Sequence, residues 1–595
     1  MILDWHKIAG LILCLISFAI SVSAKSSRAL VLVDPFTSYL SGHCTDWCKE
    51  NGVKVVEAVS EYSCATLGAD GQIVPASLRA PPPGEEMEWA EERGIVGGDD
   101  DGEDTDEDEP IPHIDDVFVI SESDSGTTVA ERIQSRIGAA GNGHSPQLRD
   151  KAKQNDMCRL AGLPTNKQVL ASSWKEAEEF LDETLWKPSK SSTTSSIKGR
   201  KSKTACVVKP NRGVASDGVT FCISKEEVKK AFNKILASPA YGEINAKNQA
   251  VLVQEFTPGG EEYAVDTVTC GGVTRVAALW RYEKIKANGS PFIYQCSELI
   301  DVDCDNERDQ IVRRKVVNYA VKALQAQGLK YGPCHIEVKV HPRTEEPKLM
   351  EINARWHAQP FLPVVEKVLP RGLDALTLTM ESFFDRPKFL KETREAQNRD
   401  FPGNKEKEGV SHERKLNHAP PAKEGGGMIV HLVQKKGGIV RDVKHLEQIE
   451  ALPSVVAMSH DAEVGEYLAP TSDHRSHSGY VVLAHKDEQQ VKTDYAAIME
   501  LQARIVEFMP EPHVIKDQGD KERRADREKK VRGKGRHAHP SVPTASQMSA
   551  ALPTSLLGRA ASKVRRATVR ALWLSGLAYT SLLAGVLLLP EHEDL

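Results

Sequence analysis

Hydrophobic and polar positions alternate most regularly in two short segments near the middle of the chain. Residues 335–340 read His-Ile-Glu-Val-Lys-Val and residues 348–355 read Lys-Leu-Met-Glu-Ile-Asn-Ala-Arg, with a proline-bounded turn between them. Because successive side chains of a strand point to opposite faces, this alternation predicts a β-hairpin with one apolar face. The residues expected on that apolar face are Ile336, Val338 and Val340 in the first strand and Met350, Ile352 and Ala354 in the second.

The polar face of this predicted hairpin collects oxygen ligands. Glu351 and Asn353 alternate along the second strand, Glu337 lies on the first, and Arg355 follows at the end. Carboxylate and amide oxygens suit Mg²⁺, which usually completes its coordination shell with water and nucleotide phosphates. Most amphipathic hairpins carry only a solvated polar face. Other segments of the chain are therefore needed to distinguish a metal site from a solvated face.

A hydrophobic strand that ends at Lys209 leads into a loop with the composition of a phosphate-binding segment. Residues 211–218 contain Gly213, Ser216 and Gly218. Glycines allow backbone N–H groups to approach phosphates closely, and an adjacent lysine neutralises phosphate charge. The Walker spacing is absent, and a strand-ending lysine is most often an ordinary surface residue.

Two other segments add candidate nucleotide contacts. Lys151 opens a predicted helix and supplies a second cation, although the same position suits a solvated helix face. The hydrophobic strand at 251–256 ends in Gln254, Glu255 and Phe256, whose backbone groups could meet an adenine edge.

The beginning of the chain predicts a parallel sheet. A buried strand at 29–34, a helix to about residue 52 and a strand at 53–59 form a β-α-β unit. Residues 80–112 interrupt this pattern with prolines, glycines and the acidic run 99–109, and they are expected to form a disordered insertion.

Composition excludes some classes of function. The 595 residues carry a net charge of −7, which gives no general basis for nucleic-acid binding. The 11 cysteines are scattered without a metal-finger spacing, which indicates reduced thiols.

Two apolar segments predict membrane association. Residues 1–24 read as a cleaved signal peptide or an uncleaved N-terminal anchor. Residues 571–590 are apolar over a length that spans a bilayer, with Arg565, Arg566 and Arg570 before them. The positive-inside tendency then predicts a single C-terminal transmembrane helix with the catalytic body in the cytosol.

The order of these segments resembles the ATP-grasp superfamily, and within it the carboxylate–amine ligases such as L-amino-acid ligases and carnosine synthase. The resemblance lies in Lys151 ahead of Ala-Gly-Leu-Pro at 161–164, Val-Val-Lys-Pro at 207–210, residues 253–266, and the hairpin at 335–355. It implies a multidomain protein of α/β and α+β type, with a parallel β-α-β pre-ATP-grasp domain, a two-lobed ATP-grasp fold, a small C-terminal α+β lobe and flanking membrane segments. The expected boundaries are 28–148 for the pre-ATP-grasp domain, 149–388 for the ATP-grasp domain with an insertion at 187–203, 389–424 for a linker, 425–510 for the C-terminal lobe, 511–570 for a basic disordered tail and 571–590 for the transmembrane helix.

The resemblance also implies a role for each candidate residue. For the nucleotide, Lys151 and Lys209 would hold the ATP phosphates under a mobile lid that contains Gly213, Ser216 and Gly218, Gln254, Glu255 and Phe256 would form the adenine hinge, and Glu262 would lie near the ribose. For the metal ion, Glu337, Glu351 and Asn353 would bind Mg²⁺ or Mn²⁺. For catalysis, Arg355 would face the transferred phosphoryl group and act together with Lys209. Many of these ligases have glycines after the arginine, whereas this chain has Trp356 and His357. The resemblance therefore does not define the substrate pocket.

The implied reaction joins a carboxylate, expected to be an amino acid, to an amine through an acyl phosphate, with release of ADP and phosphate. The expected partners are these two small molecules and a membrane, with no nucleic acid; a homodimer is left open. His335 and His357 are alternative proton acceptors for the amine. Two alternatives remain: a membrane-tethered ATP-binding scaffold without turnover, and another ATP-grasp reaction such as carboxylation.

Overall fold

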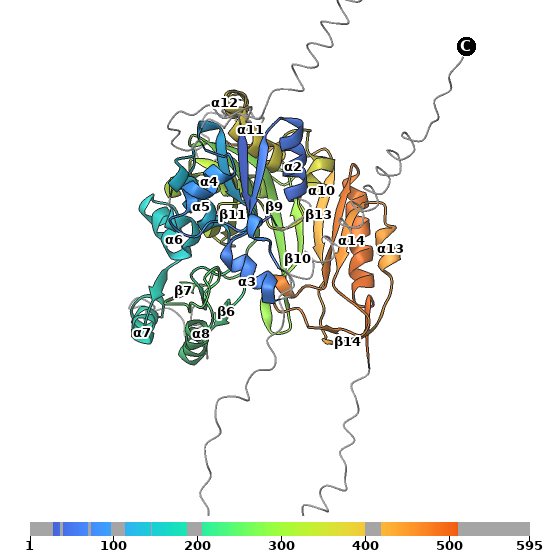
Figure 1. Cartoon of the computed structure of the whole chain (residues 1–595). Helices are drawn as coiled ribbons and strands as arrows, with labels where there is room; N and C mark the ends of the chain where they lie inside the picture. Colours follow the sequence, from blue (N-terminus) through green and yellow to red (C-terminus); the bar gives the residue numbers. More distant parts are fainter. Residues whose placement is uncertain are drawn as a thin grey trace, which may run out of the picture.

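The computed structural model of the chain describes residues 28–35, 40–69, 73–96, 114–143, 145–186, 205–398 and 418–509 (Figure 1). The segment expected as a signal peptide or anchor (1–24), the insertion at 187–203, the basic tail at 511–570 and the expected transmembrane helix at 571–590 lie outside these residues.

The N-terminal part is a parallel three-stranded sheet in the order β2-β1-β3. All five residues of β1 are buried, as expected for a strand of a parallel sheet that is covered on both faces. The strands are β1 (Ala29–Val33), β2 (Lys54–Ala58) and β3 (Val117–Ser121), and the helices are α2 (Leu40–Glu50), α3 (Glu61–Ala69), α4 (Glu86–Glu92) and α5 (Thr127–Ile137).

A four-stranded antiparallel sheet in the order β4-β7-β5-β6 forms a separate layer with its helices, seen at the lower left of Figure 1. The helix α8 is capped at its start, because the Ser224 side chain accepts a hydrogen bond from the Glu227 N–H and the Glu227 carboxylate accepts one from the preceding Ile223 N–H at 2.7 Å. The elements are α6 (Lys151–Leu160), which precedes the sheet, β4 (Gln168–Ala171), α7 (Trp174–Phe180), β5 (Cys206–Pro210), β6 (Thr220–Cys222), α8 (Lys225–Ala237) and β7 (Val251–Glu255).

An eight-stranded sheet in the order β12-β11-β8-β9-β10-β13-β17-β15 runs through the centre of the molecule. Its strands are β8 (Glu262–Cys270), β9 (Val273–Ala287), β10 (Ser290–Leu299), β11 (Tyr331–Val340), β12 (Pro347–Asn353), β13 (Gly426–His431), β15 (Val455–His460) and β17 (Gly479–His485). One face packs on α9 (Glu307–Gln327) and the other on α10 (Leu362–Val368), α11 (Ala375–Phe384) and the N-terminal sheet.

The C-terminal part is continuous with this central sheet, because β13 pairs with β10 in antiparallel register. The resemblance implied a small C-terminal α+β lobe at 425–510, and no local sequence signal indicated that its first strand would pair with β10. The remaining elements of this part are β14 (Gly438–Val443), α13 (Leu446–Glu450), β16 (Tyr467–Leu468), α14 (Glu488–Gln502) and β18 (Val506–Phe508).

The predicted hairpin is β11 and β12, and one of its predicted apolar positions is wrong. Ile336, Val338 and Ile352 are buried as expected. However, the ladder shifts by one residue between the pairs Glu337–Glu351 and Val338–Leu349, so a β-bulge lies at Met350. The bulge places Leu349 in the core and leaves Met350 beside Glu351 on the wall of a pocket.

Two stretches expected to be irregular contain helices. Part of the acidic insertion forms α4, whose Trp89 and Ala90 pack into the core of the N-terminal sheet. Part of the expected linker forms α12 (Arg386–Asn398), in which Thr393 is 1% exposed. The ten cysteines within the described residues are free thiols.

The prediction of membrane association is not supported. Among the described residues, no helix has both the length and the apolar character that crossing a bilayer requires. The longest of them is α9, with 21 residues, and charged side chains are distributed along it.

Candidate active site

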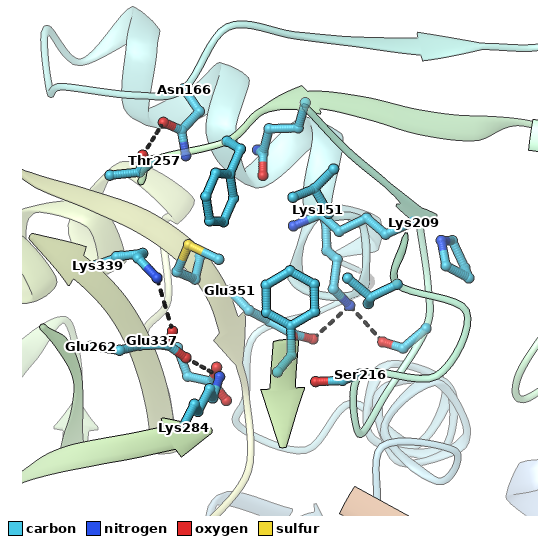
Figure 2. Close-up of a pocket in the computed structure, with 18 of the residues that line it drawn as sticks. Lys151, Asn166, Lys209, Ser216, Thr257, Glu262, Lys284, Glu337, Lys339 and Glu351 are labelled. Carbon is cyan, nitrogen blue, oxygen red and sulfur yellow. Dashed lines mark hydrogen bonds and ion pairs between the residues drawn. The ribbon is translucent and has the colours of Figure 1, made fainter. Parts of the chain in front are cut away.

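Most of the predicted site residues come together in a pocket between the four-stranded sheet and strands β8, β11 and β12 (Figure 2). The pocket holds about 800 Å³ of space, part of it open to solvent. The predicted residues that line it are Lys151, Lys209, Gly213, Ser216, Gln254, Glu255, Phe256, Glu262, Glu337 and Glu351. Gly218, Asn353 and Arg355 are not part of this lining.

Lys151 joins the two walls of the pocket. It lies in the first turn of α6, where the Asp150 carboxylate caps the helix by accepting from the Lys153 N–H. Its Nζ donates to the Gly213 carbonyl oxygen at 2.5 Å and to the Glu351 carboxylate at 2.7 Å (Figure 2). The lysine therefore links the loop after β5 to the polar face of the hairpin.

Lys209 is a buried cation on strand β5, with 5% of its surface exposed. Burial and the nearby charge of Lys151 lower the pKa of Lys209 to about 8, although Glu351 and Glu337 oppose this shift. An anion in the pocket would stabilise its charged form.

The glycines of the loop 211–218 account for only part of its backbone conformation, because Gly213 is not in the left-handed region and two non-glycine residues are. Ala215, Ser216 and Gly218 have φ values of 54°, 62° and 70°, in the left-handed region. The Asn211 side chain anchors the loop by accepting a hydrogen bond from the Ala152 N–H at 3.0 Å. This anchor leaves the middle of the loop facing the pocket.

The segment expected to meet adenine has part of its hydrogen-bonding capacity in use. The N–H of Glu255 donates to the Lys167 carbonyl at 2.8 Å, and the N–H of Phe256 donates to the Ala205 carbonyl at 3.0 Å. The Phe256 ring packs edge-on against Phe221, with 4.9 Å between centroids. These two N–H groups are therefore already engaged within the protein, and Phe256 presents an aromatic surface on the pocket wall.

The surroundings of Glu337 favour its ionised form. Glu337 stands opposite Glu351 in the β11–β12 ladder. Burial raises the pKa of Glu337, but the hydrogen bond from His335 and the charge of Lys284 outweigh it and hold the pKa at about 2. Glu262 forms ion pairs with Lys284 and Lys339.

Asn353 and Arg355 lie beyond the pocket lining. Asn353 is 2% exposed, and its Oδ1 has no hydrogen-bond partner among the described residues. The Arg355 guanidinium donates to the Asp124 carboxylate at 2.5 Å and to the Trp356 carbonyl at 2.8 Å. Asp124, after β3, thus reaches across from the N-terminal part of the chain and holds this arginine.

The two histidines proposed as proton acceptors have opposite charge states. Burial lowers the pKa of His335, but its hydrogen bond to Asp266 outweighs burial and raises the pKa to about 9. Burial and the charge of His335 lower the pKa of His357 to about 4. Of the two, His357 is therefore the neutral imidazole at pH 7.

Several pocket residues were not identified from the sequence. Asn166, Thr257, Phe292, Lys339 and the bulge residue Met350 all line the pocket. Asn166 and Thr257 are hydrogen-bonded to each other at 2.9 Å. Lys339 and Met350 belong to the predicted hairpin, and Thr257 directly follows the expected adenine segment. Asn166 and Phe292 carried no local signal, because the fold brings them to the pocket from other parts of the chain.

Comparisons with known proteins agree with this architecture. A family model described as an ATP-grasp domain matches residues 202–363, and one described as L-amino acid ligase C-terminal domain 2 matches residues 430–501. The chain is similar to dapdiamide A synthase from Enterobacter agglomerans, with 25% identity over 299 residues that cover 50% of this chain and 61% of the relative. It therefore spans less than two thirds of the length of that curated relative.

A solved structure extends the agreement in fold. The L-amino acid ligase from Bacillus licheniformis has a TM-score of 0.53 and 14% identity, and the match covers 81% of this chain and 99% of that one. At this identity the likeness concerns the fold. Together these matches confirm the resemblance inferred from the sequence: the chain carries an ATP-grasp domain followed by a C-terminal domain of the L-amino acid ligase type.

Proposed function

We propose that this protein is an ATP-dependent ligase that joins the carboxylate of an amino acid to an amine, with release of ADP and phosphate. The observation that carries the proposal is the meeting of Lys151 and Lys209 with Glu337 and Glu351 in one pocket between two sheets. Two cations and two carboxylates from separate elements are what a triphosphate with its metal ion requires. The names of the relatives, an amino acid ligase and a dapdiamide synthase, support an amino acid as the carboxylate substrate.

ATP would lie with its phosphates between the two lysines and the loop 211–218. The base would rest against Phe256, next to the carbonyl groups of Gln254 and Glu255, with Glu262 on the ribose side. Gly218, whose backbone lies in the left-handed region, would let the loop turn back behind the phosphates. Loop closure would exclude water from the reacting groups.

The hairpin residues fit a divalent cation of the magnesium type. Glu337 and Glu351 are paired across the ladder, and Asn353 follows Glu351 on the same face with an Oδ1 that has no hydrogen-bond partner among the described residues. These are the hard oxygen donors that Mg²⁺ or Mn²⁺ takes. When bound, the ion would offset phosphate charge and orient the γ-phosphate.

The reaction would proceed in two displacements. An oxygen of the substrate carboxylate attacks the γ-phosphorus, the bond to ADP breaks, and an acyl phosphate forms. The amine nitrogen then attacks the carbonyl carbon, phosphate leaves, and the nitrogen loses a proton. Arg355, oriented by Asp124, would face the transferred phosphoryl group, and Lys209 would offset its charge.

The test is a screen for ADP release from the full-length protein with pairs of amino acids and small carboxylates. We expect release only when both substrates are present, together with a product whose mass equals their sum less one water. ADP release that requires bicarbonate instead would assign the protein to the carboxylating enzymes. ATP binding without ADP release for any pair would indicate a nucleotide-binding scaffold.

A further inference from the structure

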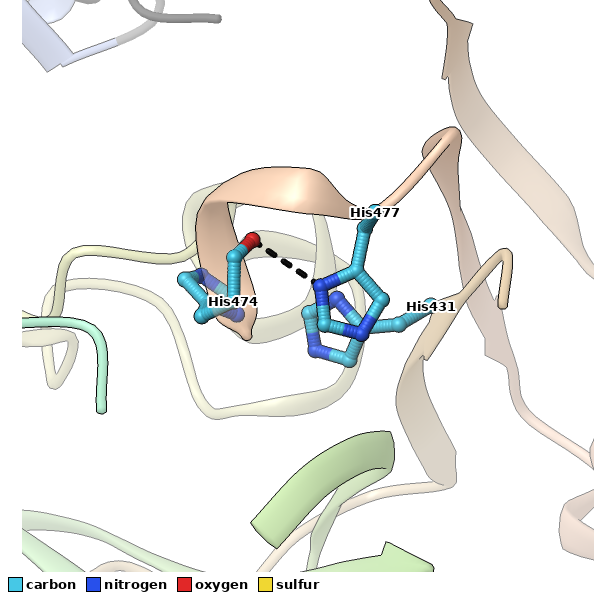
Figure 3. A group of neighbouring side chains, drawn as sticks. All are labelled: His431, His474 and His477. Carbon is cyan, nitrogen blue, oxygen red and sulfur yellow. Dashed lines mark hydrogen bonds between the residues drawn. The ribbon is translucent and has the colours of Figure 1, made fainter. Parts of the chain in front are cut away.

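Three histidine side chains meet in the C-terminal part of the chain. His431 ends strand β13, and His474 and His477 lie at the start of a short helical turn and just after it (Figure 3). One nitrogen of each ring lies within 4.8 Å of the others. The ring centroids are 4.8 to 5.3 Å apart. Segments more than 40 residues apart thus present three imidazoles to one point.

Two of these rings have a buried nitrogen with an unmet hydrogen-bonding need. Nε2 of His431 and Nδ1 of His474 are inaccessible to solvent and have no hydrogen-bond partner in the part of the chain that the structure describes. His431 as a whole is 3% exposed. Buried polar groups of this kind call for an explanation, because a native fold usually satisfies them with protein atoms, an ordered water or an ion.

In His477, by contrast, each ring nitrogen lies near a backbone carbonyl oxygen. Its Nδ1 lies 2.9 Å from the His474 carbonyl oxygen, and its Nε2 lies 2.8 Å from the Tyr294 carbonyl oxygen. A neutral imidazole has one N–H, so it donates to only one of these carbonyls, and its other nitrogen directs a lone pair at an oxygen. One nitrogen on each of the three rings therefore lacks a suitable partner.

The buried position also keeps these rings neutral. Burial lowers the pKa of all three histidines, and neighbouring imidazoles add to the effect for His431 and His474. A neutral imidazole retains the lone pair that binds a metal ion.

We propose that His431, His474 and His477 form a binding site for a transition-metal ion of the zinc class. Three imidazole ligands with one position left open form a common arrangement for Zn²⁺. Ligand nitrogens around Zn²⁺ are about 3.4 Å apart, since each Zn–N bond is ~2.1 Å, so small ring rotations would complete the site. His477 would exchange one of its carbonyl contacts for the ion.

This site differs in chemistry from the pocket carboxylates. Nitrogen donors favour Zn²⁺ and its neighbours in the transition series, whereas the oxygen donors of the hairpin favour Mg²⁺. The two sites lie near each other, because the His474 N–H donates to the Ala215 carbonyl at 3.3 Å within the loop 211–218. An ion bound by the histidines would fix the turn that this loop contacts. The inference does not depend on the proposed ligase activity.

The test measures metal binding directly. Full-length protein without a histidine tag is stripped with a chelator and titrated with Co²⁺ in excess Mg²⁺, which occupies the oxygen site. We expect one Co²⁺ per chain, with the intense visible absorption of tetrahedral coordination, and displacement by Zn²⁺. His474→Gln and His431→Gln should each weaken binding by more than ~10-fold, because even losing an outer partner of a metal-bound histidine costs that much.

His485→Gln is the matched control, since His485 lies in the same part of the chain but outside the cluster. It should bind Co²⁺ as the unaltered protein does. If His431→Gln does not fold, Co²⁺ titrations of the unaltered protein and of His474→Gln, at a less buried position, still show whether the cluster binds the ion. Absence of Co²⁺ and Zn²⁺ binding in the presence of Mg²⁺ would overturn the inference and leave a buried water as the bridge between the rings. A Co²⁺ affinity in both variants equal to that of the unaltered protein would overturn it as well.

Discussion

Lys209 is a cation that the folded chain holds at an electrostatic cost. Its pKa is lowered to about 8, whereas a lysine in the unfolded chain titrates near 10.4. Between these values the unfolded state binds more protons, so the contribution of Lys209 to stability rises with pH through this window. At pH 7 the penalty is fully present, and bound phosphate would remove it.

The substitution Lys209→Met should therefore have opposite effects with and without nucleotide. Without ATP, we expect the melting temperature at pH 7 to rise, because a penalty of up to about 3 kcal/mol disappears. With ATP and Mg²⁺, the stabilisation by ligand should be largely lost. Thermal unfolding with and without nucleotide measures both, and Lys153→Met, at an exposed position on the same helix as Lys151, is the control. A lower melting temperature without ATP would contradict this account.

Glu351 tests the metal assignment. Glu351→Gln keeps the size of the side chain but removes the charge opposite Glu337. We expect kcat for ADP release to fall at least ~100-fold, because metal-ion stabilisation of a phosphoryl-transfer transition state amounts to several kcal/mol. Glu346→Gln, in the exposed turn of the same hairpin, should leave kcat unchanged. Near-normal turnover in Glu351→Gln would show that this carboxylate holds no catalytic ion.

At the scale of single elements, the loop 211–218 depends on its backbone conformation. Gly218 has a φ of 70°, and a Cβ there would lie 3.1 Å from Cγ of Pro210. Gly271 has a φ of 56° in the turn between β8 and β9, where a Cβ would meet nothing within 4 Å. An alanine in the left-handed region costs about 1–2 kcal/mol at either position.

We therefore expect both Gly218→Ala and Gly271→Ala to lower stability, Gly218→Ala by more because its Cβ also crowds Pro210, while only Gly218→Ala raises the KM for ATP several-fold. The comparison separates backbone strain from loop shape, because only the first loop borders the pocket. Melting temperatures and ATP saturation curves of both variants provide the measurements. An equal KM in the two variants would show that the loop does not position the nucleotide.

The β11–β12 hairpin shows which side-chain orientations can be predicted from hydrophobic alternation along the chain and which cannot. A period of two placed Glu337 and Glu351 on the polar face, and both line the pocket. The same period placed Met350 in the core, but the bulge moved it to the pocket wall. A bulge is a property of the ladder between two strands, so neither strand alone encodes its position.

At the scale of the whole molecule, the sequence revealed the segments of the site but not their neighbours. Lys209 and the loop after it were recognisable because residue type and glycine spacing are local signals. Asp124 gave no such signal, and its contact with Arg355 joins residues 231 positions apart. The histidine cluster was missed for the same reason, since only the folded sheet brings His431 to the turn at His474.

The last prediction concerns this long-range contact. Asp124 pairs with Arg149 at 2.6 Å and with Arg355 at 2.5 Å, and all three side chains are 10% exposed or less. Burial raises the pKa of Asp124, but the two guanidinium groups hold it well below its usual range, so its stabilising contribution is present above pH 4 and declines as the pH falls. Asp124→Asn should lower the unfolding free energy at pH 7 by about 3–5 kcal/mol, because it leaves two buried cations without a counter-charge. Asp156→Asn, which breaks an exposed pair with Arg159, should cost under about 1 kcal/mol.

Melting curves of the unaltered protein and the two variants between pH 7 and pH 3 would test this prediction. The loss of unfolding free energy in Asp124→Asn should become smaller as the pH falls, because the Asp124 carboxylate of the unaltered protein then becomes protonated. A loss that stays constant toward low pH would show that the buried charges do not join the N-terminal sheet to the site.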